Sequence, residues 1–223
     1  MPSKVEFTFS QALSAEDLIG AIERVLREVL RCDNSFPSAV GAGALDFEIR
    51  TSSGEVATFA LLARFEIYVL LIRNIEAIST AIALADSIAL ETDFLLGWIA
   101  DQSYESVENE TDLEQLSRLG KDVRDVPRTH DTVWGDEIAD TSRNPGRRVI
   151  RRGYVEAVGA IMWLRRDRLR SAEKAGLECF DSLELAPDVF RVHFADDLFS
   201  APADTDGALL QERIRSCLFP LKL

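Results

Sequence analysis

The first ninety residues alternate between two hydrophobic periodicities, and this alternation limits the fold more than any other feature of the sequence. Val5, Phe7 and Phe9 recur at every second position, which is typical of a β-strand with one apolar face. Over residues 15–31 the apolar side chains instead recur every three or four positions, and Ser14 stands where an N-cap is expected. A strand followed directly by an amphipathic helix is therefore predicted.

Three further strands and a second helix are predicted before residue 90. Residues 45–49 alternate as a strand, residues 52–54 have turn composition, and the chain from residue 56 returns as a hairpin. Residues 65–72 are apolar on both faces, which suits a central strand, and residues 75–88 have helical spacing. These elements are expected to form a sheet with helices on one face, and the expected fold class of the chain is α+β, with a mostly antiparallel sheet and helices packed on it.

The middle of the chain has weaker patterns. Residues 94–99 are apolar, and periodicity assigns them to neither strand nor helix. Residues 121–143 are polar and are predicted to form a long loop. Asn144 and Pro145 resemble a helix start, so a long or broken helix is predicted over about 145–175, with a strand over 154–164 as the alternative.

The end of the chain returns to strands and closes with a helix. Residues 177–185 and 189–194 are predicted to form a hairpin, and residues 209–218 a final helix. Leu113, Leu116 and Leu119 indicate a short helix further upstream. The chain is expected to form one domain over residues 1–223, with an alternative boundary near 101–112.

Charge and cysteine content favour the reducing cytoplasm and a basic partner. The net charge is −13, which repels nucleic acid and anionic membranes and attracts basic proteins. Cys32, Cys179 and Cys217 lack metal or redox spacing and are expected to be free thiols. No secretory signal or membrane span is expected, because residues 1–9 run directly into a strand and the apolar stretch 59–72 is interrupted by charges.

Motifs for catalysis, metals and cofactors do not emerge. Gly41-Ala42-Gly43 precedes a strand, whereas a phosphate loop follows a strand and opens a helix. His130-Asp131 has too few other histidines in the chain to complete a metal site, and Asp204 to Gly207 lacks the glutamate of a calcium loop. We therefore predict no catalytic residue, no metal and no cofactor.

Basic residues concentrate in one segment. Over residues 143–170, nine arginines against two acids give a charge of +7, which leaves −20 for the rest of the chain. These arginines are expected to pair with acids elsewhere in the protein. The alternative is an anion-binding site, as in an enzyme that handles phosphorylated or other small molecules. The candidate anion-binding residues are Arg147, Arg148, Arg151 and Arg152.

Acids gather near aromatic residues in the remaining sequence. Carboxylates give fast electrostatic capture, and aromatic side chains give buried anchors. The favoured function is a non-enzymatic protein that masks a basic partner, a character shared by bacterial immunity proteins that inhibit toxins; a structural subunit of a larger assembly is another alternative. The predicted partner-binding residues are Asp101, Tyr104, Glu105, Glu108, Glu110, Asp112, Glu114, Trp134, Asp136 and Glu137.

Overall fold

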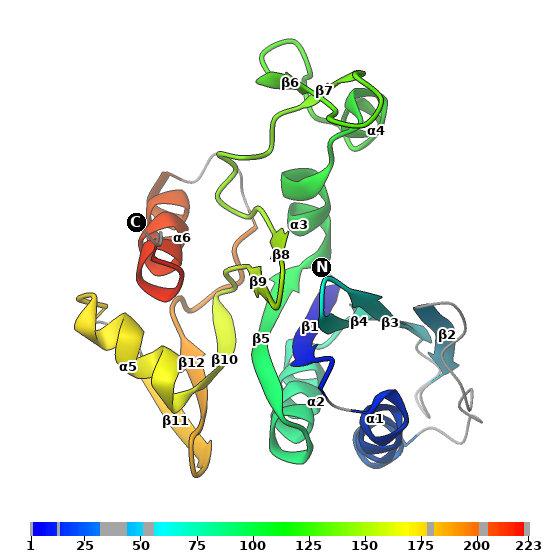
Figure 1. Ribbon diagram of the computed structural model, residues 1–223, viewed down its shortest axis with the longest axis vertical. Coiled ribbons are helices and arrows are strands. Elements are labelled where there is room, and N and C mark those ends of the chain that lie inside the picture. Colours follow the sequence, from blue (N-terminus) through cyan, green and yellow to red (C-terminus); the bar gives the residue numbers. More distant parts are fainter. Residues whose placement is uncertain are drawn as a thin grey trace.

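An eight-stranded antiparallel sheet runs through the molecule (Figure 1). The computed structural model describes residues 2–12, 14–31, 44–50, 56–177, 181–200 and 205–220. The prediction of an α+β fold with a mostly antiparallel sheet is confirmed. In spatial order the strands are β11 (Asp181–Ala186), β12 (Val189–His193), β10 (Ile161–Arg165), β5 (Phe94–Asp101), β1 (Ser3–Ser10), β4 (Ile67–Ile75), β3 (Val56–Arg64) and β2 (Ala44–Arg50).

Helices cover both faces of this sheet. On the face of Val5, Phe7 and Phe9, the helices α1 (Ala15–Leu30) and α2 (Ile78–Glu91) pack together over a first apolar core. On the opposite face, α5 (Arg166–Lys174) and α6 (Thr205–Leu218) contribute to a second core. For the first ninety residues, the expectation of helices on one face is confirmed by α1 and α2, and the second half of the chain supplies the other layer.

The first strand and helix form as their periodicities predict. The side chain of Ser14 accepts a hydrogen bond from the backbone N–H of Asp17 at 3.5 Å, which caps α1. Phe7, on the central strand β1, lies 5.5 Å from the ring of Phe94 and 5.9 Å from that of Trp163. Gly97 allows this packing, since a Cβ there would lie 2.3 Å from the Phe7 ring. The sheet thus has an aromatic centre.

The helix predicted over about 145–175 is wrong for most of its length. The segment forms the hairpin of β8 (Val149–Arg151) and β9 (Tyr154–Glu156), then β10, and becomes helical only at α5. Its apolar spacing misleads because residues 161–164 are buried on both faces of the sheet. Gly153, with φ +81°, makes the hairpin turn. The strand alternative over 154–164 was nearer to the structure.

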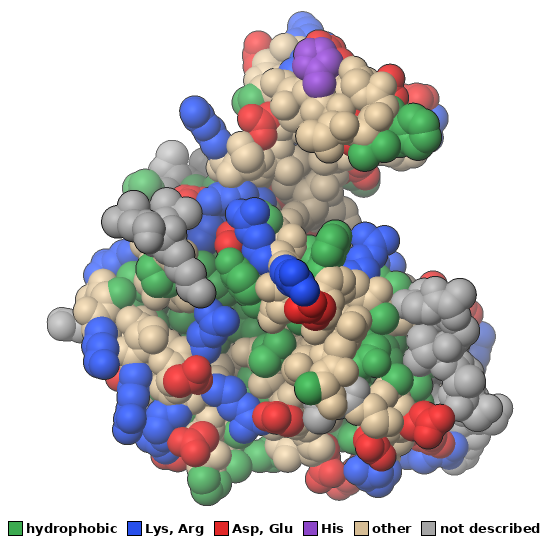
Figure 2. All heavy atoms as spheres, viewed as in Figure 1, with side chains coloured by type: hydrophobic (Ala, Val, Ile, Leu, Met, Phe, Trp, Pro, Cys, Tyr) green, Lys and Arg blue, Asp and Glu red, His purple; other side chains and the backbone are tan. Residues whose placement is uncertain are grey.

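Residues 110–140, called the lobe from here on, project from the end of the sheet (Figure 1). The chain enters the lobe through α3 (Gln102–Asn109), which follows β5 directly. The lobe contains α4 (Leu113–Arg118) and the hairpin of β6 (Arg128–His130) and β7 (Glu137–Ala139). The loop predicted over 121–143 therefore contains two short strands. Figure 2 shows the lobe as a knob joined to the body by a narrower waist.

Several other predictions have clear outcomes. The undecided run 94–99 belongs to strand β5, and the predicted final hairpin and helix are present as β11, β12 and α6. Cys217 is buried on α6, as its apolar setting predicts. The predicted turn at 52–54, the glycine pair at 41–43, and Cys32 and Cys179 lie outside the described residues.

Candidate functional site

The four arginines singled out as an alternative anion site already have carboxylate partners. Arg148 lies 2.8 Å from Glu6, and Arg151 lies 3.2 Å from Glu156. The other two also form ion pairs, Arg147 with Glu212 and Arg152 with Glu66. This pairing agrees with the internal role expected for the arginine-rich segment.

Four of the predicted partner-binding residues lie inside the molecule. Asp101 is 4% exposed and caps α3 by accepting from the N–H of Tyr104 at 2.7 Å. Tyr104 is itself buried against Gln211, and Glu108 is buried and accepts from the N–H of Gly146 at 3.0 Å. Glu105 is mostly buried and pairs with Lys4 at 2.5 Å. These four side chains hold α3 in place and do not form a surface that a partner could reach.

The other six predicted residues belong to the lobe, where some of them cap a helix or form ion pairs. Asp112 caps α4 by accepting from the N–H groups of Glu114 and Gln115. Two more acids are in ion pairs, Glu114 with Arg118 and Glu137 with Arg128, each at 2.5 Å. The six residues that the structure brings together here are Glu110, Asp112, Glu114, Trp134, Asp136 and Glu137.

A stiff turn over residues 131–136, the tip turn, joins the two strands of the lobe. One carboxylate oxygen of Asp131 accepts from the N–H groups of Val133 and Trp134, both at 2.7 Å. The backbone closes the turn, since the N–H of Asp131 donates to the carbonyl of Asp136 at 2.8 Å and Gly135 donates to the carbonyl of Asp131 at 3.0 Å. Four backbone N–H groups of the turn are satisfied within it, which stabilises its backbone conformation.

The tip turn holds two apolar side chains in the solvent. Trp134 is 82% exposed and Val133 is 74% exposed, whereas the other tryptophans, Trp98 and Trp163, are buried. The sequence predicts that Trp134 is exposed, but the role of Asp131 was missed. An aspartate followed by a glycine four residues later, between two short alternating runs, is the local signal that could have found this turn.

The surface of the lobe is strongly acidic. Residues 110–140 contain nine acids and four bases, a charge of −5. Asp122 and Asp140 stay ionised at neutral pH. Hydrogen bonds from Arg124 lower the pKa of Asp122, and hydrogen bonds from Ser142 lower the pKa of Asp140. Asp125 and Asp136 are exposed, and neither has an ion pair among the described residues.

Little apolar packing holds the lobe together. Within it only Leu116 and Ala139 have fully buried side chains. A cleft of about 230 Å³ lies between the segment 121–127 and the root of the lobe, and its lining includes Val107 of α3, Leu116 of α4 and Asn144. The lobe therefore depends on polar contacts for its shape and on its root for its attachment to the body.

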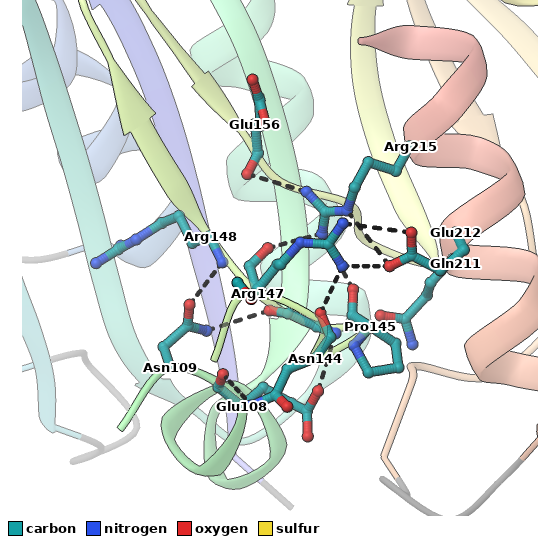
Figure 3. Close-up of polar contacts among 12 residues, drawn as sticks. Glu108, Asn109, Asn144, Pro145, Arg147, Arg148, Glu156, Gln211, Glu212 and Arg215 are labelled. Carbon is teal, nitrogen blue, oxygen red and sulfur yellow. Dashed lines mark hydrogen bonds and ion pairs between the residues drawn. The ribbon is translucent and has the colours of Figure 1, made fainter. Parts of the chain in front are cut away.

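The root of the lobe is a dense set of polar contacts between α3 and the returning segment 144–148 (Figure 3). The side chain of Asn109 accepts from the N–H of Arg148 at 2.5 Å and donates to the carbonyl of Gly146 at 3.1 Å. Asn144 donates to the carbonyl of Glu108 at 2.9 Å. Gly146 is required here, because a Cβ would lie 2.7 Å from the side chain of Glu108. These contacts join α3, which leads into the lobe, to the segment 144–148, which returns from it.

Arg215 of α6 holds the returning segment against the body (Figure 3). Its guanidinium group donates to three backbone carbonyls, those of Pro145, Arg147 and Glu156, at 3.0, 2.7 and 3.3 Å. Burial, together with the nearby charge of Arg147, lowers the pKa of Arg215 to about 10. The group remains charged at neutral pH and stabilises an otherwise irregular stretch of backbone.

Comparisons of the chain with protein-family models, with curated proteins and with solved structures found no match. Among the described residues, no helix is long and apolar enough to cross a membrane, and no three His, Cys, Asp or Glu side chains are grouped to hold a metal ion. What the chain does is therefore inferred from the lobe, its tip turn and its root.

Proposed function

We propose that this chain is a non-enzymatic binding protein that masks a basic protein partner, and that the lobe is its contact surface. The observation that carries the proposal is the tip turn, which holds Trp134 82% exposed on a backbone fixed by Asp131. Trp134 and the neighbouring Val133 together form an exposed apolar tip, and tryptophan is enriched among the residues that anchor protein interfaces. A fixed backbone also reduces the entropy lost on binding.

The charge of the lobe favours a basic partner. The lobe carries −5 of the chain's total of −13, on a part that extends away from the body. A projecting acidic surface attracts a positively charged protein over a distance of about one Debye length and raises the association rate. The apolar tip would then hold the complex together after the charges have oriented it.

The proposed mechanism is steric occlusion with electrostatic steering. The lobe would cover a basic functional surface of the partner, and the body would act as a rigid base. In its most specific form, the proposal is that the chain is a bacterial immunity protein or antitoxin-like inhibitor acting in the cytoplasm on a basic toxin. The acidic charge and the exposed anchor support this form, and identification of the partner tests it.

The first test is capture of the tagged chain from its native host at low and high salt, with identification of the retained proteins by mass spectrometry. The proposal predicts one stoichiometric basic protein whose retention weakens as salt rises. Failure to retain a basic protein at either salt concentration would overturn the proposal.

Charge reversal then tests whether the lobe makes the contact. Asp125→Lys with Asp136→Lys is expected to lower the association rate with the purified partner by about tenfold or more at low salt. The matched control is Asp46→Lys with Glu173→Lys, which changes the net charge equally on exposed positions of the body. Stopped-flow kinetics should show a much smaller change for the control, and equal rates for the two variants would contradict a contact through the lobe.

A further inference from the structure

A group of four charged side chains lies between the central strand and the root of the lobe; two are buried, and the other two, Glu105 and Arg148, are 13% and 26% exposed. Glu6 on β1 is 0% exposed and lies 2.8 Å from both Lys4 and Arg148. Lys4 also lies 2.5 Å from Glu105 on α3. The group has two positive and two negative members, so its formal charge is balanced. We call these four residues, Lys4, Glu6, Glu105 and Arg148, the clasp.

The clasp joins three separate parts of the chain. Lys4 and Glu6 belong to the strand at the middle of the sheet, Glu105 belongs to the helix that leads into the lobe, and Arg148 belongs to the segment that returns from it. One guanidinium nitrogen of Arg148, Nη1, lies 2.8 and 2.9 Å from the two carboxylate oxygens of Glu6. The contact is charge-assisted, and such hydrogen bonds are stronger than those between neutral groups.

The contacts of Glu6 keep it ionised. Burial alone would raise the pKa of Glu6, but the charges and hydrogen bonds of Lys4 and Arg148 outweigh burial and hold this pKa below its ordinary value. Taking ions out of water costs free energy, and a well-packed apolar group in the same place is often at least as stabilising. Stability alone is therefore a poor explanation for a group of four largely buried charges at this place.

Orientation of the lobe is a better explanation. Apolar packing contributes little to the attachment of the lobe, because only Leu116 and Ala139 among its described residues have fully buried side chains. Directional ion pairs can do so, since they are satisfied in one geometry and lost in others. The clasp contacts both chain segments that connect the lobe to the body, α3 and the returning segment. A small rotation of the lobe about these segments produces a large displacement of the tip turn.

We propose that the clasp is a positioning device that holds the lobe, and with it Trp134, in one orientation relative to the sheet. Arg148 and Glu6 are its central positioning residues. The purpose of this orientation rests on the proposed function, because a pre-oriented tip binds a partner with less loss of entropy. The orientation itself can be tested without any partner.

The test is ¹⁵N relaxation of the purified full-length chain, compared between lobe and body amides. In the native protein both sets are expected to have order parameters near about 0.85, typical of rigid backbone. In Arg148→Met the lobe amides are expected to fall toward about 0.6 while the body amides stay unchanged. Arg152→Met is the control, because it removes an exposed arginine–carboxylate pair from the nearby turn between β8 and β9.

A second variant separates positioning from stability and covers the case in which Arg148→Met does not fold. Lys4→Met, Glu6→Leu, Glu105→Leu and Arg148→Met together replace the clasp by apolar groups and leave no unpaired charge. This variant is expected to keep the native unfolding midpoint or exceed it, yet to show the same loosened lobe. If the clasp only stabilises the fold, this variant should change the unfolding midpoint and leave the order parameters of the lobe amides unchanged.

The outcomes for the clasp and for the proposed function are distinguishable. Unchanged lobe order parameters in both variants would overturn the clasp, even if a partner binds through Trp134. If the lobe order parameters fall but the partner binds elsewhere on the protein, the positioning role of the clasp is supported. The proposed function of the lobe is then overturned.

Discussion

The body of the molecule and the lobe hold their shapes by different means. The body has two apolar cores, one on each face of the sheet, with large side chains such as Trp98, Trp163 and Phe7 fully buried. The lobe buries only Leu116 and Ala139 and relies on side chains that bond to nearby backbone. The cores supply the stability of the fold, and the polar contacts of the lobe define a shape that the body keeps in place.

This difference is useful for a protein that presents a binding surface. An apolar core needs many residues, whereas a tip held by a few hydrogen bonds can be small and can expose its apolar side chains to a partner. The cost is that the lobe depends on its root. Substitutions in each region test whether the body and the lobe unfold independently.

Truncation of one buried side chain in each region should have different consequences. Trp163→Ala is expected to lower the free energy of unfolding by about 3–5 kcal/mol, because it leaves a cavity in the aromatic centre and removes a 2.9 Å hydrogen bond to Asp86. Leu116→Ala is expected to destabilise the lobe locally by about 2 kcal/mol. Urea unfolding should detect the first change, and hydrogen exchange of lobe amides the second.

If Leu116→Ala shifts the main urea unfolding midpoint as much as Trp163→Ala does, the body and the lobe unfold as one unit. The distinction between a stable body and a locally supported lobe would then be lost.

Removing the charge of Glu6 should have the next largest effect, and this effect should depend on pH. Glu6→Gln is expected to lower the free energy of unfolding by about 3 kcal/mol near neutral pH, because Lys4 and Arg148 lose their shared buried partner. The folded-state pKa of Glu6 lies below the ordinary value of 4.5. Its ionisation therefore stabilises the protein above that pH, and the contribution is lost as the pH falls through the folded-state value.

Urea unfolding of the native protein and Glu6→Gln at several pH values measures this dependence. The two curves should be well separated near neutral pH and should approach each other as the pH falls below 4.5 toward the lowered folded-state pKa of Glu6. Glu66→Gln, which alters an exposed pair with Arg152, is the control and should give a smaller separation. A separation that does not narrow in acid would show that Glu6 acts by its shape and not by its charge.

The elements of the body could largely be predicted from the sequence, because each has one strongly apolar face. The strand of Val5, Phe7 and Phe9 and the helix over residues 15–31 are examples, and local spacing was sufficient for both. Residues 161–164 could not be assigned in this way, since a strand covered on both faces lacks the alternation that distinguishes it from a helix.

The candidate site could be predicted only in part. Trp134 was expected on the surface and is exposed, but Tyr104 was expected beside it and is buried. Acids are usually solvated, so Asp101 and Glu108 were placed on the surface by default, although they cap and brace α3. The pairing of Glu6 with Arg148 joins residues far apart in the sequence, and no local pattern could show it.

The most direct test of the central claim is the dissociation constant of the captured and purified partner for the native chain and for Trp134→Ala. Leu209→Ala is the matched control, because Leu209 is an apolar residue of α6 that is 69% exposed on the body. We expect Trp134→Ala to weaken binding by about tenfold or more, a change of about 1.4 kcal/mol or more, and Leu209→Ala to leave it unchanged. Equal affinities of Trp134→Ala and the native chain would contradict the claim that the tip of the lobe anchors a partner.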